Sequence, residues 1–98
     1  MAKIIFRQEA INDLSNIWDY TLQKWSEKQA DHYYSIIKLA CHQIGLNPIL
    51  GKEYNRINDK LQGLKSGKHI IFYHQISESE IEIIRILYER MDLKKQSN

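Results

Sequence analysis

The chain has 98 residues, a formal net charge of +2, and 43% hydrophobic and 27% charged residues. A chain of this length forms one domain with a modest core, and so small a net charge does not by itself indicate a nucleic-acid partner. The single cysteine, Cys41, excludes an internal disulfide and has no metal-ligand spacing around it. We therefore expect a buried thiol in a reducing compartment. There is no Gly-rich phosphate loop and no metal-binding pattern, so no cofactor is expected.

The sequence also predicts a cytoplasmic location. Lys3 and Arg7 interrupt the N-terminal apolar residues too early for a signal peptide. No run approaches the roughly 18 apolar residues of a membrane span, so no membrane partner is expected. We expect a single domain over residues 1–98, with a short, polar and mobile tail at about 93–98.

A short strand and a first helix are predicted at the start of the chain. Ile4, Ile5 and Phe6 lie between charged residues, which is typical of a short strand. From Glu9 onwards the apolar residues recur in steps of three and four. This spacing predicts a helix whose apolar face consists of Ile11, Leu14, Trp18, Leu22 and Trp25.

A second helix is predicted to begin near Glu27. Ser26 and Gln29 have the spacing of a capping box. Gly45 and Asn47-Pro48 end the helix, because the residue before a proline is disfavoured in helical conformation. Its apolar stripe consists of Ala30, Tyr33 or Tyr34, Ile37, Cys41 and Ile44. Since so few residues separate the two helices, they must fold back as an antiparallel hairpin.

The second half of the chain is predicted to be mostly strands. A connecting stretch over 48–59 leads to strands at 61–65, 68–76 and 81–88, with turns at Ser66-Gly67 and at 77–80. The last strand is apolar at both alternating positions, so we expect it to be central and covered on both faces. The fold class is therefore α+β, in the order β-α-α-β-β-β, with the helix hairpin packed on a small antiparallel sheet.

Two blocks carry a resemblance to a known family. They are Ser66-Gly67-Lys68-His69-Ile70-Ile71-Phe72-Tyr73 and the run from Ile81 to Asp92. Together with Asp13-Leu14 and Ile17–Tyr20 in the first helix and Asn47–Gly51 after the second, they resemble the ParE toxins of the RelE/ParE superfamily. The resemblance covers nearly the whole chain. One departure is Tyr88, which stands where ParE proteins usually have a histidine, and tyrosine has no group that titrates near neutral pH.

The resemblance implies a function and partners. ParE toxins act on DNA gyrase by stabilising a broken-DNA intermediate, which blocks replication. A ParD-type antitoxin neutralises the toxin in a hetero-oligomer, and operator DNA is contacted only indirectly, through the antitoxin. RelE toxins share the fold but cleave messenger RNA on the ribosome, so a RelE-type endoribonuclease is the alternative. A third hypothesis is an inactive or antitoxin-bound relic of a toxin, whose only function is to form the complex that represses its operon.

A nuclease would need a general base, a general acid and a cation on one surface. The catalytic candidates for that alternative are His69, Arg85 and Tyr88. In a regular strand Arg85 shares a face with Ile83 and Leu87, whereas Tyr88 shares the other face with Ile84 and Ile86. The two residues therefore cannot serve one site unless a bulge or the strand end intervenes.

Structural roles compete with each of these candidates. His69 and His74 alternate with apolar neighbours, which favours strand residues on partly buried faces. For Tyr73 and Tyr88, packing with a polar tip is favoured over a role as an acid. An arginine within an apolar strand needs a partner, and for Arg85 we consider Glu82, Asp92, an antitoxin carboxylate or a substrate.

The charge distribution favours the gyrase-directed reading without catalysis by the toxin. Basic residues in the second half are offset by nearly as many acidic ones. A surface with balanced charge attracts a polyanion such as RNA only weakly. An amphipathic antitoxin segment is expected to cover apolar groups near the second helix or the last strand. The polar tail either is solvated or helps to engage gyrase. The residues predicted to contact target or antitoxin are Tyr33, Tyr34, Ile37, Lys65, Lys68, His69, Arg85, Tyr88 and Arg90.

Overall fold

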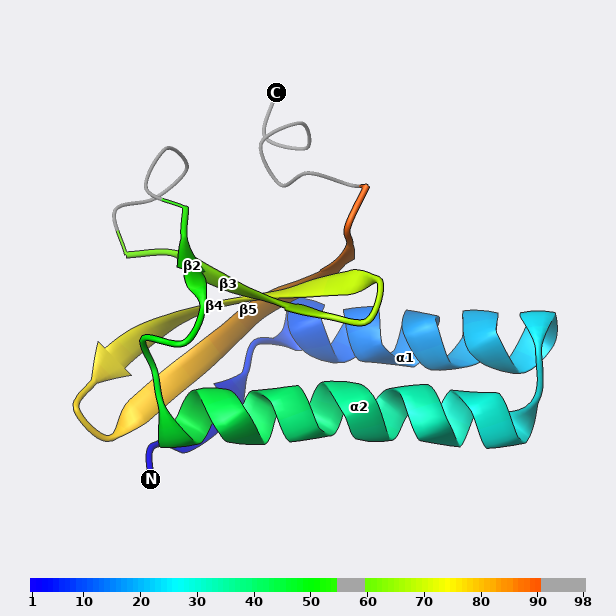
Figure 1. The fold of residues 1–98 in the computed structure, drawn as a ribbon, viewed down its shortest axis with the longest axis horizontal. Coiled ribbons are helices and arrows are strands. Elements are labelled where there is room, and N and C mark those ends of the chain that lie inside the picture. The colour runs from blue at the N-terminus through cyan, green and yellow to red at the C-terminus, as the bar shows by residue number, and fades with distance from the viewer. Residues whose placement is uncertain (55–59, 91–98) are drawn as a thin grey trace.

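The computed structural model describes residues 1–54 and 60–90. Its elements are β1 (Lys3–Phe6), α1 (Gln8–Lys24), α2 (Glu27–Leu46), β2 (Lys52–Glu53), β3 (Gln62–Ser66), β4 (His69–Ser77) and β5 (Glu80–Tyr88). Figure 1 shows α1 and α2 side by side as a hairpin against the sheet, with the closed end of the hairpin projecting beyond the strands. The predicted α+β class and the helix hairpin are confirmed. The predicted tail at about 93–98 lies outside the described residues.

The sheet has five strands in the order β1-β5-β4-β3-β2. Neighbouring strands are antiparallel except β1, which pairs parallel with β5, so the expected antiparallel sheet is in fact mixed. The two-residue strand β2 lies inside the predicted connecting stretch, because two residues are too few to give a periodic pattern. The expectation that the last strand is central is confirmed, since β5 lies between β1 and β4.

Local signals in the sequence set the helix start and the turns. The Ser26 hydroxyl accepts a hydrogen bond from the Gln29 N–H at 3.1 Å, which confirms the predicted cap of α2. The β3–β4 turn consists of Gly67 and Lys68, one residue later than predicted, because Ser66 pairs with His69. Gly67 has a φ of +60°, a conformation that favours glycine.

The core-facing side of α1 differs from the predicted apolar face. Ala10, Leu14 and Ile17 pack toward the sheet, whereas Leu22 and Trp25 are 41% and 70% exposed. The small side chain of Ala10, which is fully buried, lets the start of the helix approach the strands closely. Of the predicted face, only Leu14 packs against the core, and Trp25 lies just beyond the end of α1.

A bulge in β5 changes which side chains share a face. Phe72 pairs with Arg85 and the next residue, Tyr73, pairs with Ile83, so Ile84 is the extra residue on β5. The predicted alternation is therefore interrupted at Ile84, so that Ile83 shares a face with Ile86, and Ile84 shares the other face with Leu87. From Arg85 to Tyr88 the pairing with β4 is regular again, so the bulge does not bring Arg85 and Tyr88 onto one face.

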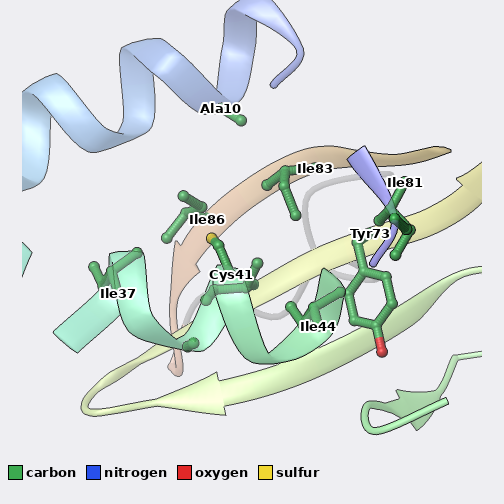
Figure 2. Packing of buried hydrophobic residues seen from close by; sticks show 11 residues of the cluster. Ala10, Ile37, Cys41, Ile44, Tyr73, Ile81, Ile83 and Ile86 are labelled. Carbon is green, nitrogen blue, oxygen red and sulfur yellow. The ribbon is translucent and has the colours of Figure 1, made fainter. Parts of the chain in front are cut away.

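The two faces of the sheet support two apolar clusters. Ile83 and Ile86 join the main cluster against the helices, and Figure 2 shows Ile37, Cys41 and Ile44 of α2 packing onto these strand residues. A smaller cluster, with Leu61, Phe72 and Leu87 at its centre, lies apart from the main one. The alternation of β4 places this cluster on the opposite face of the sheet, so β5 is covered on both faces as expected.

Tyr73 is a packing residue with a satisfied polar tip. Its ring is fully buried in the main cluster. Its hydroxyl donates to the Pro48 carbonyl at 2.8 Å and accepts from the Gly51 N–H at 2.8 Å. Tyr73 thereby attaches the segment after α2 to the centre of the sheet.

Candidate functional site

Most of the predicted site residues meet at one end of the sheet. The register places His69 beside both Ser66 of β3 and Tyr88 of β5, so the β3–β4 turn lies next to the end of β5. Tyr33 reaches this point from α2. We call this group the turn cluster and define it as Tyr33, Lys65, Lys68, His69, Tyr88 and Glu89.

Tyr33 and His69 form the centre of the turn cluster. The Tyr33 hydroxyl accepts a hydrogen bond from the Lys68 N–H at 2.8 Å and lies 2.6 Å from His69 Nδ1. Its proton has two acceptors within reach, the Ser66 carbonyl at 3.4 Å and, at the shorter distance, an unprotonated His69 Nδ1, in which case the imidazole proton lies on Nε2. A Cβ at Gly67 would lie 2.7 Å from the Tyr33 ring, so the turn must present a glycine to this side chain.

The environment keeps both central groups uncharged at neutral pH. Burial lowers the pKa of His69, although the carboxylates of Asp13 and Glu89 oppose this shift. Burial also raises the pKa of Tyr33, although the Lys68 N–H opposes that shift. A neutral imidazole that accepts from a neutral phenol is a stable arrangement, and it needs no bound substrate to satisfy it.

Tyr88 covers the other side of His69. The two rings are 5.7 Å apart at an interplanar angle of 77°, and the Tyr33 and His69 rings are 5.4 Å apart at 61°. Edge-to-face contacts of this kind stabilise aromatic packing. Tyr88 remains 36% exposed, so part of its ring is available to a partner.

The rim of the turn cluster is basic. Lys65 Nζ lies 2.9 Å from a Glu89 carboxylate oxygen. This contact lowers the pKa of Glu89, and the charges of Arg90 and Lys68 lower it further. Three cations therefore surround one carboxylate, and a local excess of positive charge remains although the whole chain is nearly balanced.

Arg85 is engaged by the first helix. Its Nε and Nη2 donate to the two carboxylate oxygens of Asp13 at 2.8 and 3.0 Å, and the Ile86 N–H donates to Asp13 Oδ2 at 2.9 Å. The hydrogen bonds to Asp13 raise the pKa of Arg85. The partner is therefore not Glu82, as considered from the sequence, and Asp92 lies outside the described residues.

Glu82 has other partners. It accepts from Arg7 Nη2 at 2.9 Å and lies 2.7 Å from His74 Nε2, so the three side chains link β1, β4 and β5. The hydrogen bond from Arg7, followed by that from His74, lowers the pKa of Glu82. His74 therefore has a structural contact, away from the turn cluster.

The three binding residues predicted on α2 are placed in different environments. Tyr33 belongs to the turn cluster. Ile37 is 1% exposed and lies in the main core, so the folded chain offers it to no partner, which corrects the prediction for this residue. Tyr34 is 43% exposed and contacts Trp18 of α1 edge-on, with ring centroids 6.4 Å apart. Tyr34 therefore lies on the surface of the hairpin.

Metal and thiol chemistry have no evident place in the described parts of the chain. Within residues 1–54 and 60–90, no three His, Cys, Asp or Glu side chains are grouped to hold a metal ion. Burial raises the pKa of the Cys41 thiol to about 12, so it is not a nucleophile at neutral pH. Among the described helices, none is long and apolar enough to cross a membrane.

Comparison with known proteins identifies the family. The model of the ParE toxin of the type II toxin–antitoxin system parDE matches residues 4–93. The chain belongs to this ParE toxin family. It is 32% identical over 82 residues to Toxin ParE1 of Mycobacterium tuberculosis, with 84% of each chain covered. It is 29% identical over 82 residues to Toxin ParE1 of Caulobacter vibrioides, with 84% of this chain and 83% of the relative covered.

A solved structure shares the fold. A chain of the chromosomal ParDE TA system from P. aeruginosa superimposes with a TM-score of 0.76, covering 90% of this chain and 96% of that one. The sequence identity is 17%, so this likeness concerns the fold alone. The resemblance to ParE toxins stated from the sequence is confirmed.

Sequence reasoning missed the role of Asp13. It was noted only as part of the first-helix pattern, although an acidic residue between Ala10, Leu14 and Ile17 lies on the core-facing side of the helix. A carboxylate there needs a cationic or N–H partner. Had the core face been assigned correctly, Arg85 would have been the natural candidate.

Proposed function

We propose that this protein is the toxin of a type II toxin–antitoxin pair, that it poisons DNA gyrase, and that it acts by binding rather than by catalysis. Membership of the ParE toxin family supports the toxin assignment. The observation that carries the mode of action is the Arg85–Asp13 pair. Asp13 occupies Nε and Nη2 of the arginine, so this cation is not poised to stabilise the developing charge of RNA cleavage.

A cognate ParD-type antitoxin is the proposed neutralising partner. The fold neighbour comes from a ParDE system, which supports a two-protein complex for this chain as well. The exposed part of Tyr88 and the basic rim formed by Lys65 and Lys68 are the proposed contact region for gyrase or for an acidic antitoxin segment. Operator DNA would be bound through the antitoxin.

A ribosome-dependent endoribonuclease is the second candidate. It is supported by the Tyr33–His69 contact of 2.6 Å, because a phenol and an imidazole in contact can relay a proton. The basic rim beside this pair could receive a phosphate. Against this candidate, burial lowers the pKa of His69, which keeps the imidazole from holding a proton as a general acid near neutral pH.

The deciding experiment compares two targets with one toxin preparation. Toxin released from its antitoxin is incubated with gyrase and supercoiled plasmid, and in parallel with ribosomes programmed with a messenger RNA. Toxin-dependent linear plasmid with intact message is the expected result. Cleaved message with normal supercoiling would replace the proposal by the nuclease, and inactivity in both assays would identify a relic. Toxin re-bound to antitoxin is the matched control for both reactions.

A further inference from the structure

One carboxylate lies among three cations at the end of the sheet. Lys65 Nζ is 2.9 Å from a Glu89 carboxylate oxygen, and the positive charges of Arg90 and Lys68 also act on this carboxylate. We call Lys65, Lys68 and Arg90 the rim cations. They belong to three separate segments, namely β3, the β3–β4 turn and the residues that follow β5. The fold thus gathers positive charge at one place from segments that are apart in the sequence.

The rim cations outnumber the carboxylates available to them. In residues 1–54 and 60–90, Lys65 forms an ion pair with Glu89, whereas the two other rim cations form none. The Asp13 carboxylate, whose charge acts on His69, is already paired with Arg85. Within the described part of the chain, two positive charges at this end of the sheet therefore remain without a partner.

The backbone of Lys68 is held from both sides. Its N–H donates a hydrogen bond to the Tyr33 hydroxyl at 2.8 Å, and its carbonyl accepts one from the Glu89 N–H at 2.8 Å. The Lys68 side chain is exposed. A binding surface that is fixed beforehand loses less conformational entropy when its ligand arrives. Only the end of this side chain must therefore become ordered when an anion binds.

The two turns that flank β4 differ in charge. The β3–β4 turn carries Lys68, whereas the β4–β5 turn carries Glu78, and Glu80 follows it at the start of β5. The pairing of β4 with β5 places these turns at opposite ends of the strand, as Figure 1 shows. A polyanion would be attracted to the first turn and not to the second. The near balance of charge over the whole chain therefore coexists with a local preference for anions.

The arrangement of the rim cations indicates the kind of anion. Exposed cations on three separate segments fit a linear polyanion, in which phosphates repeat at short intervals, better than they fit a single carboxylate. An acidic peptide would in addition need apolar anchors to bind firmly, and the rim cations themselves offer none. In the proposed activity gyrase holds DNA, so DNA phosphates are present in the complex that the toxin enters.

We propose that the rim cations bind backbone phosphates of the DNA that gyrase holds, and that Glu89 competes with these phosphates for Lys65. This inference rests on the proposed function, in which the toxin poisons gyrase. The contact is independent of base sequence, because backbone phosphates are alike at every position. It is also distinct from the binding of operator DNA, which the proposed function assigns to the antitoxin.

Two variants of equal charge test the role of Glu89. The probe is a fluorescein-labelled DNA duplex of about 20 base pairs, and its affinity for toxin released from antitoxin is measured by fluorescence anisotropy at about 20–150 mM salt. Glu89→Gln and Glu78→Gln each remove one negative charge, but only Glu89→Gln frees Lys65. We expect Glu89→Gln to lower the Kd about threefold or more, and Glu78→Gln less than about 1.5-fold. A variant that fails to fold would not be expected to bind more tightly.

A second pair of variants removes a cation. Lys68→Gln should raise the Kd about threefold or more and reduce the slope of log Kd against log salt concentration by about 0.9, the value for one phosphate. Lys38→Gln, at an exposed position of α2, is the matched control and should change neither quantity. Circular dichroism verifies that both variants are folded. A labelled oligoglutamate that binds more tightly than the duplex would overturn DNA as the ligand and assign the rim cations to an acidic peptide.

The same four variants in the gyrase assay separate this inference from the proposed function. At limiting toxin, Glu89→Gln should yield more linear plasmid than Glu78→Gln, and Lys68→Gln less than Lys38→Gln. Equal linearisation by all four would overturn the DNA contact and leave gyrase poisoning intact. The expected order of DNA affinities, without linearisation by wild type, would overturn gyrase as the target and support the DNA site alone. Equal DNA affinities in all four variants, or no binding by wild type, would overturn the DNA site whatever gyrase does.

Discussion

Asp13 and Arg85, which are 72 residues apart in the sequence, form a two-point ion pair between the first helix and the last strand, at 2.8 and 3.0 Å. The Asp13 side chain is 12% exposed and that of Arg85 is 32% exposed, so the ion pair is largely buried but still in contact with solvent. Asp13 also accepts the Ile86 N–H. One carboxylate thus fixes both the position of α1 over β5 and the direction of the arginine.

Replacing Asp13 should destabilise the fold. Asp13→Asn keeps the size of the side chain but removes the charge and one acceptor, so at least one donor of Arg85 or Ile86 loses its partner. We expect the free energy of unfolding to fall by about 1–3 kcal/mol. Urea denaturation of Asp13→Asn and of Asp19→Asn, at an exposed position of the same helix, provides the comparison. Equal stabilities would show that the pair contributes little.

Tyr73→Phe should destabilise the protein without changing its apolar core. The variant removes a hydroxyl that serves both Pro48 and Gly51 and leaves those backbone groups without this partner. The expected loss is about 1–2 kcal/mol. Tyr20→Phe, at a 63% exposed position, should change the stability by less than about 0.5 kcal/mol. Chemical denaturation measures both, and an unaffected Tyr73→Phe would mean that the segment after α2 is held by other contacts.

Acidification should destabilise the turn cluster through His69. Burial lowers the pKa of this imidazole below the ordinary value of 6.5. Between the lowered pKa and 6.5 the unfolded chain therefore binds more protons than the folded one, and stability falls as the pH falls. The contribution is fully present above pH 6.5 and is lost below it, toward the folded pKa.

The pH effect is measured as a difference between variants. The free energy of unfolding is determined above and below pH 6.5 for wild type, for His69→Asn and for His32→Asn, whose side chain is exposed. The loss of stability on acidification should be smaller in His69→Asn than in the other two proteins. The same loss in all three would place the pH sensitivity at another group.

Two substitutions of Tyr88 separate a binding role from an acid role. Tyr88→Phe preserves the ring that packs on His69, whereas Tyr88→Ala removes it. If Tyr88 contacts gyrase through its ring, the phenylalanine variant should retain most of the plasmid linearisation and the alanine variant should lose about tenfold. Tyr20→Ala is the exposed control. Loss of activity in Tyr88→Phe alone would point to the hydroxyl as a proton donor.

The order of elements could be predicted because local signals decided it. The cap at Ser26, the steps of three and four in α1, and the apolar run of β5 each act within a few residues of sequence. The features of the sheet that could not be predicted depend on contacts between strands that are far apart in the sequence. The parallel pairing of β1 with β5 and the two-residue strand β2 exist only because the folded sheet offers an edge to each.

The core face of α1 was predicted wrongly for a related reason. Larger apolar residues suggested one stripe, yet the sheet packs against Ala10, Leu14 and Ile17, and it accepts Asp13 on that side because Arg85 is there to meet it. In the candidate site, the sequence named Tyr33, His69, Tyr88 and the lysines as candidates. It could not reveal that the Tyr33 hydroxyl would contact His69 or that a bulge at Ile84 would alter the alternation.

The shortness of β1 has a consequence for the behaviour of the free protein. β1 pairs only with Glu80–Ile83, so among the described residues no strand runs beside the outer edge of the remainder of β5. An open edge invites a strand of another molecule and, at high concentration, chain-to-chain polymerisation. The Asp13 carboxylate accepts the outward N–H of Ile86, so this donor is not available to a foreign strand. The residue that orients the arginine therefore also occupies one of the hydrogen-bond donors along this edge.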